Sequence, residues 1–236
     1  MPPFPFDAVL FDCDGVLVDS EAITCQVLAD MLGEMGWHLS LEETMQIFVG
    51  KAVRDEAAQI LFRTGVAITD RWLGDFRERR NAALERDLVA IPDAPEAVRA
   101  IATMVNGRIA VASGADRHKV QLQLRKVGLH DAFANKMFSG HETPRSKPWP
   151  DVYLAAAKAL GVDPARCAII EDTATGARAG VAAGATVFGY SPGGPGHSST
   201  QALLDEGVAT VFQSMGALPA LLSHWPADHR SLIPER

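Results

Sequence analysis

The stretch from Val9 to Glu21, VLFDCDGVLVDSE, constrains the fold more than any other part of the chain. It joins a short apolar run, Ala8–Phe11, to two aspartates that stand one residue apart, Asp12 and Asp14. An apolar run of this length, bounded by residues that break regular structure, is typical of a buried strand. The sequence therefore predicts carboxylates at the end of a buried strand, where they need a counter-charge or a ligand.

Three further runs have the same apolar, β-branched character, and helical patterns separate them. They are RIAVAS, CAIIED and TVFGY, at 108–113, 167–172 and 186–190. One of the intervening helices is predicted over 150–161, where proline begins and glycine ends the apolar pattern. Strands that alternate with helices at this spacing predict an α/β fold with a doubly wound, Rossmann-like parallel sheet.

The segment between the first two strands has a different pattern, because only amphipathic helices are predicted from Glu21 to about Leu88. SLEE at 40–43 forms a capping box, and Trp72 and Phe76 share one face of a later helix. The basic cluster Arg77, Arg79 and Arg80 on that helix is interpreted as a solvated face. We therefore expect a helical cap domain over 18–89, inserted into a catalytic core of 1–17 and 90–236, with hinges near 18–20 and 89–92.

Composition limits the classes of function. The net charge of -7 and the lack of a strong basic run argue against nucleic-acid binding. No stretch approaches the roughly 20 apolar residues that span a bilayer, and the first ten residues lack a signal-peptide pattern. The three cysteines lack metal-site spacing. We expect a cytoplasmic protein with a small-molecule substrate and no nucleic-acid, membrane or obligate protein partner.

Polar side chains gather at the predicted strand ends, and ligands of open parallel sheets bind beyond the carboxyl ends of the strands. Each of these residues alone could be a cap or a turn former, but together they favour a site. Oxygen ligands beside a phosphate-sized anion suit Mg²⁺, and a lysine would offset the remaining charge. The candidate residues are Asp12, Asp14, Ser113, Lys147, Glu171 and Asp172.

Four segments together resemble the haloacid dehalogenase-like superfamily, in its subfamily I, which carries a helical cap after the first strand. The resemblance runs from about Phe6 to Tyr190. An acid at the position of Asp14 is absent from the dehalogenases themselves, so a phosphatase is implied. The four segments are FDCDGVLVDSE, the Ser113 that ends AVAS, the Lys147 of SKPWPDVY, and IIEDTATGARAGVAAG.

The resemblance implies a role for each candidate residue. Asp12 would be the nucleophile that forms an aspartyl-phosphate, and Asp14 the general acid and base. Ser113 and Lys147 would hold the phosphoryl oxygens together with the backbone amides of the next loop. Those amides belong to Gly114 and Ala115. The Mg²⁺ ligands would be Asp12, the main-chain carbonyl of Asp14, and Asp172, with Glu171 as a ligand or a close neighbour.

Three functions remain open at this stage. The chain looks similar to bacterial sugar-phosphate phosphatases of the 6-phosphogluconate type. Lys51 and Arg54 are the candidate cap residues that face the substrate; the alternative is that they are solvated charges at helix ends. The alternative is a hexose-phosphate mutase resembling β-phosphoglucomutase, but Thr24 and Val49 stand where those enzymes have histidine and lysine. A non-enzymatic phospho-receiver fits worse, because receivers place the acidic pair before the acceptor aspartate.

Overall fold

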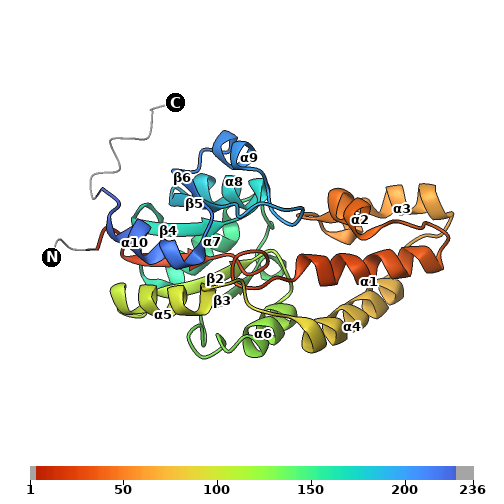
Figure 1. Cartoon of the computed structure of the whole chain (residues 1–236), viewed down its shortest axis with the longest axis horizontal. Helices are drawn as coiled ribbons and strands as arrows, with labels where there is room; N and C mark the ends of the chain where they lie inside the picture. Colours follow the sequence, from red (N-terminus) through yellow and green to blue (C-terminus); the bar gives the residue numbers. More distant parts are fainter. Residues whose placement is uncertain (1–3, 227–236) are drawn as a thin grey trace.

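The computed structural model describes residues 4–226, which form a parallel sheet flanked by helices and a separate group of helices at one end (Figure 1). The sheet has six strands in the order β3-β2-β1-β4-β5-β6, and every pair of neighbours is parallel. The strands are β1 (Ala8–Phe11), β2 (Ile109–Ser113), β3 (Met137–Ser139), β4 (Cys167–Glu171), β5 (Thr186–Tyr190) and β6 (Thr210–Phe212). The predicted doubly wound α/β fold is confirmed.

Helices cover both faces of the sheet, because the strand side chains are buried alternately on the two sides. Val9 and Phe11 of β1 pack with one layer of helices, whereas Ala8 and Leu10 pack with the other. The first layer is α5 (Ala94–Met104), α6 (Arg117–Lys126) and α10 (Leu218–Ser223). The second layer is α7 (Asp151–Leu160), α8 (Ala174–Ala182) and α9 (Thr200–Asp205).

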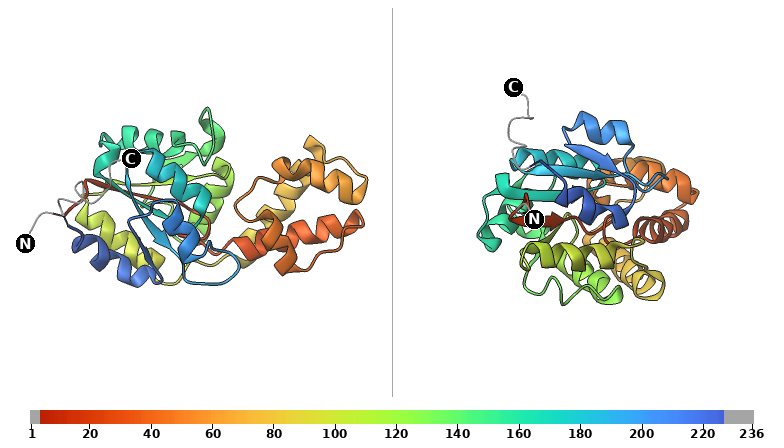
Figure 2. Two further views of the ribbon diagram at one scale, coloured as in Figure 1. Left: turned by 90° about the horizontal axis from the view of Figure 1, so that it is seen from above. Right: turned by 60° about the vertical axis from the view of Figure 1, so that its left-hand side comes forward.

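The residues between β1 and α5 form a helical group with its own apolar cluster, built around Leu28, Leu32, Phe48 and Phe76. Figure 2 shows this group beside the end of the sheet. The capping box at Ser40 is present. The division into two domains with the stated boundaries stays a prediction. The elements of the group are α1 (Glu21–Glu34), α2 (Leu41–Phe48), η1 (Val53–Glu56), α3 (Ala57–Thr64) and α4 (Asp70–Asp87).

The two chain segments that join this group to the sheet run side by side. The backbone N–H of Asp19 donates to the carbonyl of Val89 at 3.1 Å, and that of Ile91 donates to the carbonyl of Leu17 at 3.1 Å. A short antiparallel bridge links Val18 to Ala90. The entry to α1 therefore lies next to the exit from α4.

Two strands were not predicted from the sequence, β3 and β6. Both lie at the edges of the sheet and have three residues each. Along the described part of the chain, no helix is long and apolar enough to cross a membrane.

Candidate active site

The register of the sheet brings the predicted catalytic residues to one edge. Phe11 of β1 pairs with Val111 of β2 and with Ile170 of β4, so the three strands end together. Asp12 continues the ladder, because its backbone N–H donates to the carbonyl of Ile170 at 3.0 Å. Its side chain is buried and lines a cavity between the sheet and the helical group.

Lys147 is the cation of this edge. Its Nζ donates to Asp12 Oδ1 at 2.6 Å and to Glu171 Oε1 at 2.6 Å. Burial opposes the positive charge of Lys147, but the two carboxylates raise its pKa well above its usual value. Burial raises the pKa of Asp12 to about 7, and the neighbouring acids Glu171 and Asp14 add to this against the opposing effect of Lys147.

Glu171 is held by more donors than any other acid at this edge. Its Oε1 accepts from the hydroxyl of Tyr153 at 2.6 Å as well as from Lys147. Its Oε2 accepts from the backbone N–H of Asp172 at 3.1 Å and from the Thr173 hydroxyl at 3.2 Å. Gly176 leaves the space for it, because a Cβ there would lie 1.8 Å from Oε1. The carboxylate is therefore fixed in place and satisfied.

Asp172 is the opposite case. Its Oδ1 is buried and has no hydrogen-bond partner in the structure. Burial, with Glu171 and Asp12 as neighbours, raises its pKa well above the usual value. One carboxylate oxygen from each of these three acids lies within 4.8 Å of the other two. An unpartnered oxygen beside two further carboxylates has the chemistry of a hard-cation site, so these residues fit a bound Mg²⁺.

Asp14 lies in different surroundings from Asp12. Its Oδ1 accepts hydrogen bonds from Lys119 Nζ at 2.7 Å, from Gln123 Nε2 at 2.7 Å, and from the Ser20 hydroxyl. Burial alone would raise its pKa, but the charge of Lys119 and the three hydrogen bonds outweigh burial and lower the pKa to about 2. Asp14 therefore stays ionised in the ligand-free protein.

The loop after β2 closes another side of the cavity, which Ser113, Gly114 and Ala115 all line. The Ser113 hydroxyl accepts a hydrogen bond from the backbone N–H of Ala115 at 3.0 Å. The Ser139 hydroxyl donates to the Ala115 carbonyl at 2.7 Å and ties the loop to β3. The loop is held in shape by these contacts and presents its hydroxyl and backbone to the cavity.

The cavity has a volume of about 750 Å³, and the helical group forms its second wall. Lys51 and Arg54 line this wall, but each pairs with an acid of the same group, Glu56 at 3.0 Å and Asp70 at 2.5 Å. Their role toward a substrate stays a prediction.

The interpretation of the basic cluster on α4 was wrong for Arg80. Its side chain is only 10% exposed, and it pairs with Asp116 at 3.1 Å, at the start of α6. Arg77 is exposed but lines the cavity. Arg79 also follows the prediction, because it is half exposed and pairs with Glu34. Arg80 therefore joins α4 to the start of α6, whereas Arg77 and Arg79 are exposed to solvent.

The sequence analysis missed the three partners of Asp14, which are Lys119, Gln123 and Ser20, and one partner of Glu171, which is Tyr153. Lys119 and Gln123 are four residues apart on α6, so they share a face of that helix. Both are buried, although their polarity is typical of a solvated face. The signal that could have found them is this spacing directly after Ser113, at the carboxyl edge of the sheet.

Comparison with known families agrees with this site. The model of the haloacid dehalogenase-like hydrolases matches residues 6–184. The chain belongs to this family of hydrolases, as its four sequence segments predicted.

Similarity to named relatives indicates which kind of hydrolase this chain is. The chain is 32% identical to the 6-phosphogluconate phosphatase of Escherichia coli K12 over 183 residues, which is 77% of this chain and 81% of that protein. It is 29% identical to hexitol phosphatase B of the same organism over 184 residues, covering 75% and 79%. The crystal structure of a family hydrolase from Deinococcus radiodurans, with bound phosphate and sodium, is 39% identical with a TM-score of 0.76, covering 93% and 96%. The prediction of an enzyme of the phosphatase class is confirmed.

Proposed function

We propose that this chain is a Mg²⁺-dependent phosphatase of small phosphorylated metabolites, with sugar phosphates as the main substrate class. The observation that carries the proposal is Asp12, a buried carboxylate that lines the cavity and shares Lys147 with a second acid. The two relatives named above are phosphatases of a sugar acid and of hexitols, which supports this substrate class. A cytoplasmic location is part of the same proposal.

In the first half of the reaction, a carboxylate oxygen of Asp12 forms a bond to phosphorus and the ester oxygen leaves. Asp14 passes a proton to that leaving oxygen. Because its pKa is about 2 in the ligand-free site, the proton enters with the substrate, whose phosphate has a second pKa of about 6. In the second half, water attacks the phosphorus of the aspartyl-phosphate and Asp14 accepts its proton.

Lys147 and Ser113 stabilise the charge that spreads over the phosphoryl oxygens, with the backbone amides of Gly114 and Ala115 beside them. Mg²⁺ would be held by Asp12, Asp172 and the main-chain carbonyl of Asp14, with Glu171 as a further ligand or a close neighbour. When bound there, it supplies charge neutralisation and polarises the phosphoryl group. The phosphate and sodium in the Deinococcus radiodurans relative support an anion and a cation in sites of this family.

The mutase alternative rests on the shared fold, and one position argues against it. Thr24 stands where such mutases carry a histidine, and its hydroxyl is buried in the cavity wall without a hydrogen-bond partner. A threonine hydroxyl can hydrogen-bond a sugar but cannot serve as a proton shuttle near neutral pH. Hydrolysis is therefore the better-supported outcome.

The test is phosphate release from a panel of sugar phosphates, phosphosugar acids, nucleotides and β-glucose 1-phosphate, with Mg²⁺ and then with EDTA. We expect metal-dependent, multiple-turnover release, fastest with a sugar or sugar-acid phosphate. Conversion of β-glucose 1-phosphate to glucose 6-phosphate without net release would establish the mutase. Accumulation of stable phosphoprotein without turnover would establish a receiver.

A further inference from the structure

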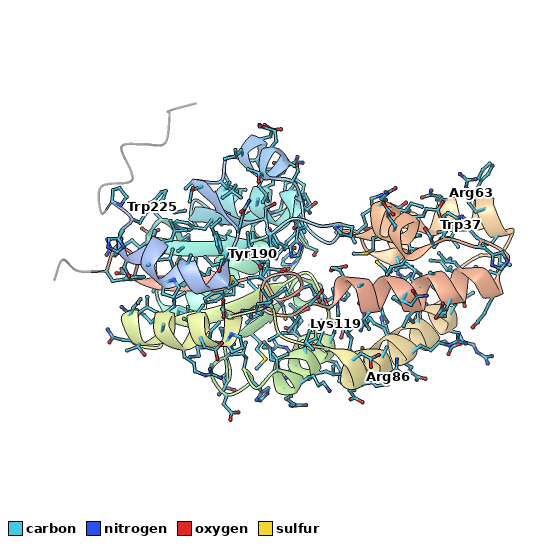
Figure 3. The ribbon with its side chains drawn as sticks, viewed as in Figure 1. Trp37, Arg63, Arg86, Lys119, Tyr190 and Trp225 are labelled. Atoms are coloured by element: carbon cyan, nitrogen blue, oxygen red, sulfur yellow. The ribbon has the colours of Figure 1, made fainter. Side chains whose placement is uncertain are left out.

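We infer that Lys119 is a positioning residue for proton transfer: with Gln123 it fixes Asp14 so that one carboxylate oxygen faces the leaving group. The inference rests on the function proposed above. Figure 3 labels Lys119, which lies on α6 near the start of α1. Lys119 is 6% exposed, and its ammonium has Asp14 Oδ1 as its only side-chain partner among the described residues.

The contacts of Asp14 are one-sided. Three donors converge on Oδ1, from Lys119, Gln123 and Ser20. Within residues 4–226, no hydrogen bond uses Oδ2, although Asp14 lines the cavity. A carboxylate held through one oxygen has a fixed orientation, and its other oxygen is left for a substrate. Oδ2 is therefore the atom that gives and takes the proton.

The two α6 donors are themselves fixed. The Oε1 of Gln123 lies 3.4 Å from the Cys13 thiol, which donates to it, so the amide group presents Nε2 to Asp14. The backbone N–H of Lys119 donates to Asp116, the residue that caps α6, at 2.9 Å. The donors on Asp14 therefore belong to the rigid start of a helix, and only Ser20 comes from the segment that enters α1.

Asp14 must present Oδ2 to the leaving oxygen when it gives a proton, and to water when it accepts one. The contacts from Lys119 and Gln123 to Oδ1 hold the carboxyl group in that orientation, so no reorganisation is needed during the reaction. Lys119 therefore matters most for substrates whose leaving oxygen needs a proton.

The test compares two substrate types in Lys119→Met, which keeps the length of the side chain and removes its charge. A sugar phosphate needs a proton on its leaving alcohol, whereas p-nitrophenyl phosphate leaves as a stable anion. We expect kcat/KM for the sugar phosphate to fall on the order of 10²-fold, and kcat/KM for p-nitrophenyl phosphate to change less than about threefold. KM for the sugar phosphate should change little, and Lys119→Arg should restore part of the loss.

The second half-reaction gives an independent readout. If Asp14 is misplaced, water attack on the aspartyl-phosphate slows, while attack of Asp12 on p-nitrophenyl phosphate continues. Lys119→Met should therefore release a burst of one p-nitrophenol per enzyme before a slower steady state. A residue with a purely structural role would not produce this burst.

Lys126→Met is the matched control, because Lys126 is an exposed lysine of the same helix that bonds the carbonyl of Arg86. It should behave as the wild type. Equal losses for both substrates, or a rise in KM alone, would overturn the inference. If Lys119→Met does not fold, Gln123→Leu provides the test. We expect it to lower kcat/KM for the sugar phosphate more than for p-nitrophenyl phosphate, by a smaller factor than Lys119→Met. A wild type that releases no phosphate from any ester would instead remove the proposed function.

Discussion

The surroundings of Asp12 and of Asp14 differ in charge, although the two residues are separated by only one position in the chain. Near Asp12, three buried acids lie together, two of them share Lys147, and an oxygen of the third, Asp172, has no partner. Near Asp14, an ammonium and two neutral donors converge on one carboxylate oxygen, and Glu21 is near enough to interact electrostatically with Asp14 and Lys119. The cluster near Asp12 carries excess negative charge and suits a cation and a phosphoryl group. The contacts of Asp14 hold a single side chain in one orientation.

The largest expected effect comes from removing the nucleophile. Asp12→Asn should abolish turnover, by on the order of 10⁴-fold or more, because an amide cannot form the aspartyl-phosphate. The fold should survive, since the change removes one of three repelling acids. Phosphate release from the best substrate measures the first point, and the melting temperature measures the second. Turnover near the wild-type rate would show that the Asp12 cluster is not the reaction centre.

The three acids near Asp12 could be predicted because each lies at the end of an apolar run that is recognisable in the sequence. Asp12 and Asp172 stand directly after buried strands and Glu171 is the last residue of one, and parallel pairing brings strand ends together. Lys147 follows no such run; its signal in the sequence is its place just before a predicted helix start, to which the family resemblance adds. The structure then adds a contact that no pattern shows, the sharing of Lys147 by Asp12 and Glu171.

The partners of Asp14 could not be predicted in the same way. A lysine and a glutamine on a helix favour a solvated face, and only a buried carboxylate opposite them reverses that interpretation. Arg80 was misjudged for the same reason, because its acid partner lies 36 residues away in the sequence. The edge strands β3 and β6 escaped because three residues are too few to show a period. Short elements and long-range ion pairs depend on the tertiary fold.

The excess charge near Asp12 also predicts how stability depends on pH in the metal-free protein. The pKa of Asp12 is about 7 in the folded state and 3.8 for the ordinary carboxyl. Between these values the folded state keeps a proton that the unfolded state has released, so the free energy of unfolding falls as the pH rises. At about 1.4 kcal/mol per pKa unit, the loss is a few kcal/mol. Asp14 adds no slope in this window, because it is ionised in both states.

Urea unfolding at pH 5 and pH 7 in EDTA measures this slope, and added Mg²⁺ should flatten it by neutralising the acids. Asp12→Asn should make the slope smaller, and the raised pKa values of Asp172 and Glu21 account for the part that remains. An unchanged slope in Asp12→Asn would mean that the excess charge near Asp12 does not destabilise the folded chain.

The smallest expected effect concerns the ion pair that joins α4 to the start of α6, the helix that carries Lys119 and Gln123. Arg80→Met removes the ion pair with Asp116, whose side chain is 26% exposed and can be hydrated. We therefore expect a loss of only about 1–2 kcal/mol in the free energy of unfolding, measured with urea. Asp116 still caps α6 in this variant, so Lys119 and Gln123 should keep their places. The ratio of kcat/KM for a sugar phosphate to that for p-nitrophenyl phosphate should then equal the wild-type ratio. A fall in that ratio would mean that Asp14 is held by the helical group as well as by α6, and the two clusters would differ in mobility as well as in charge.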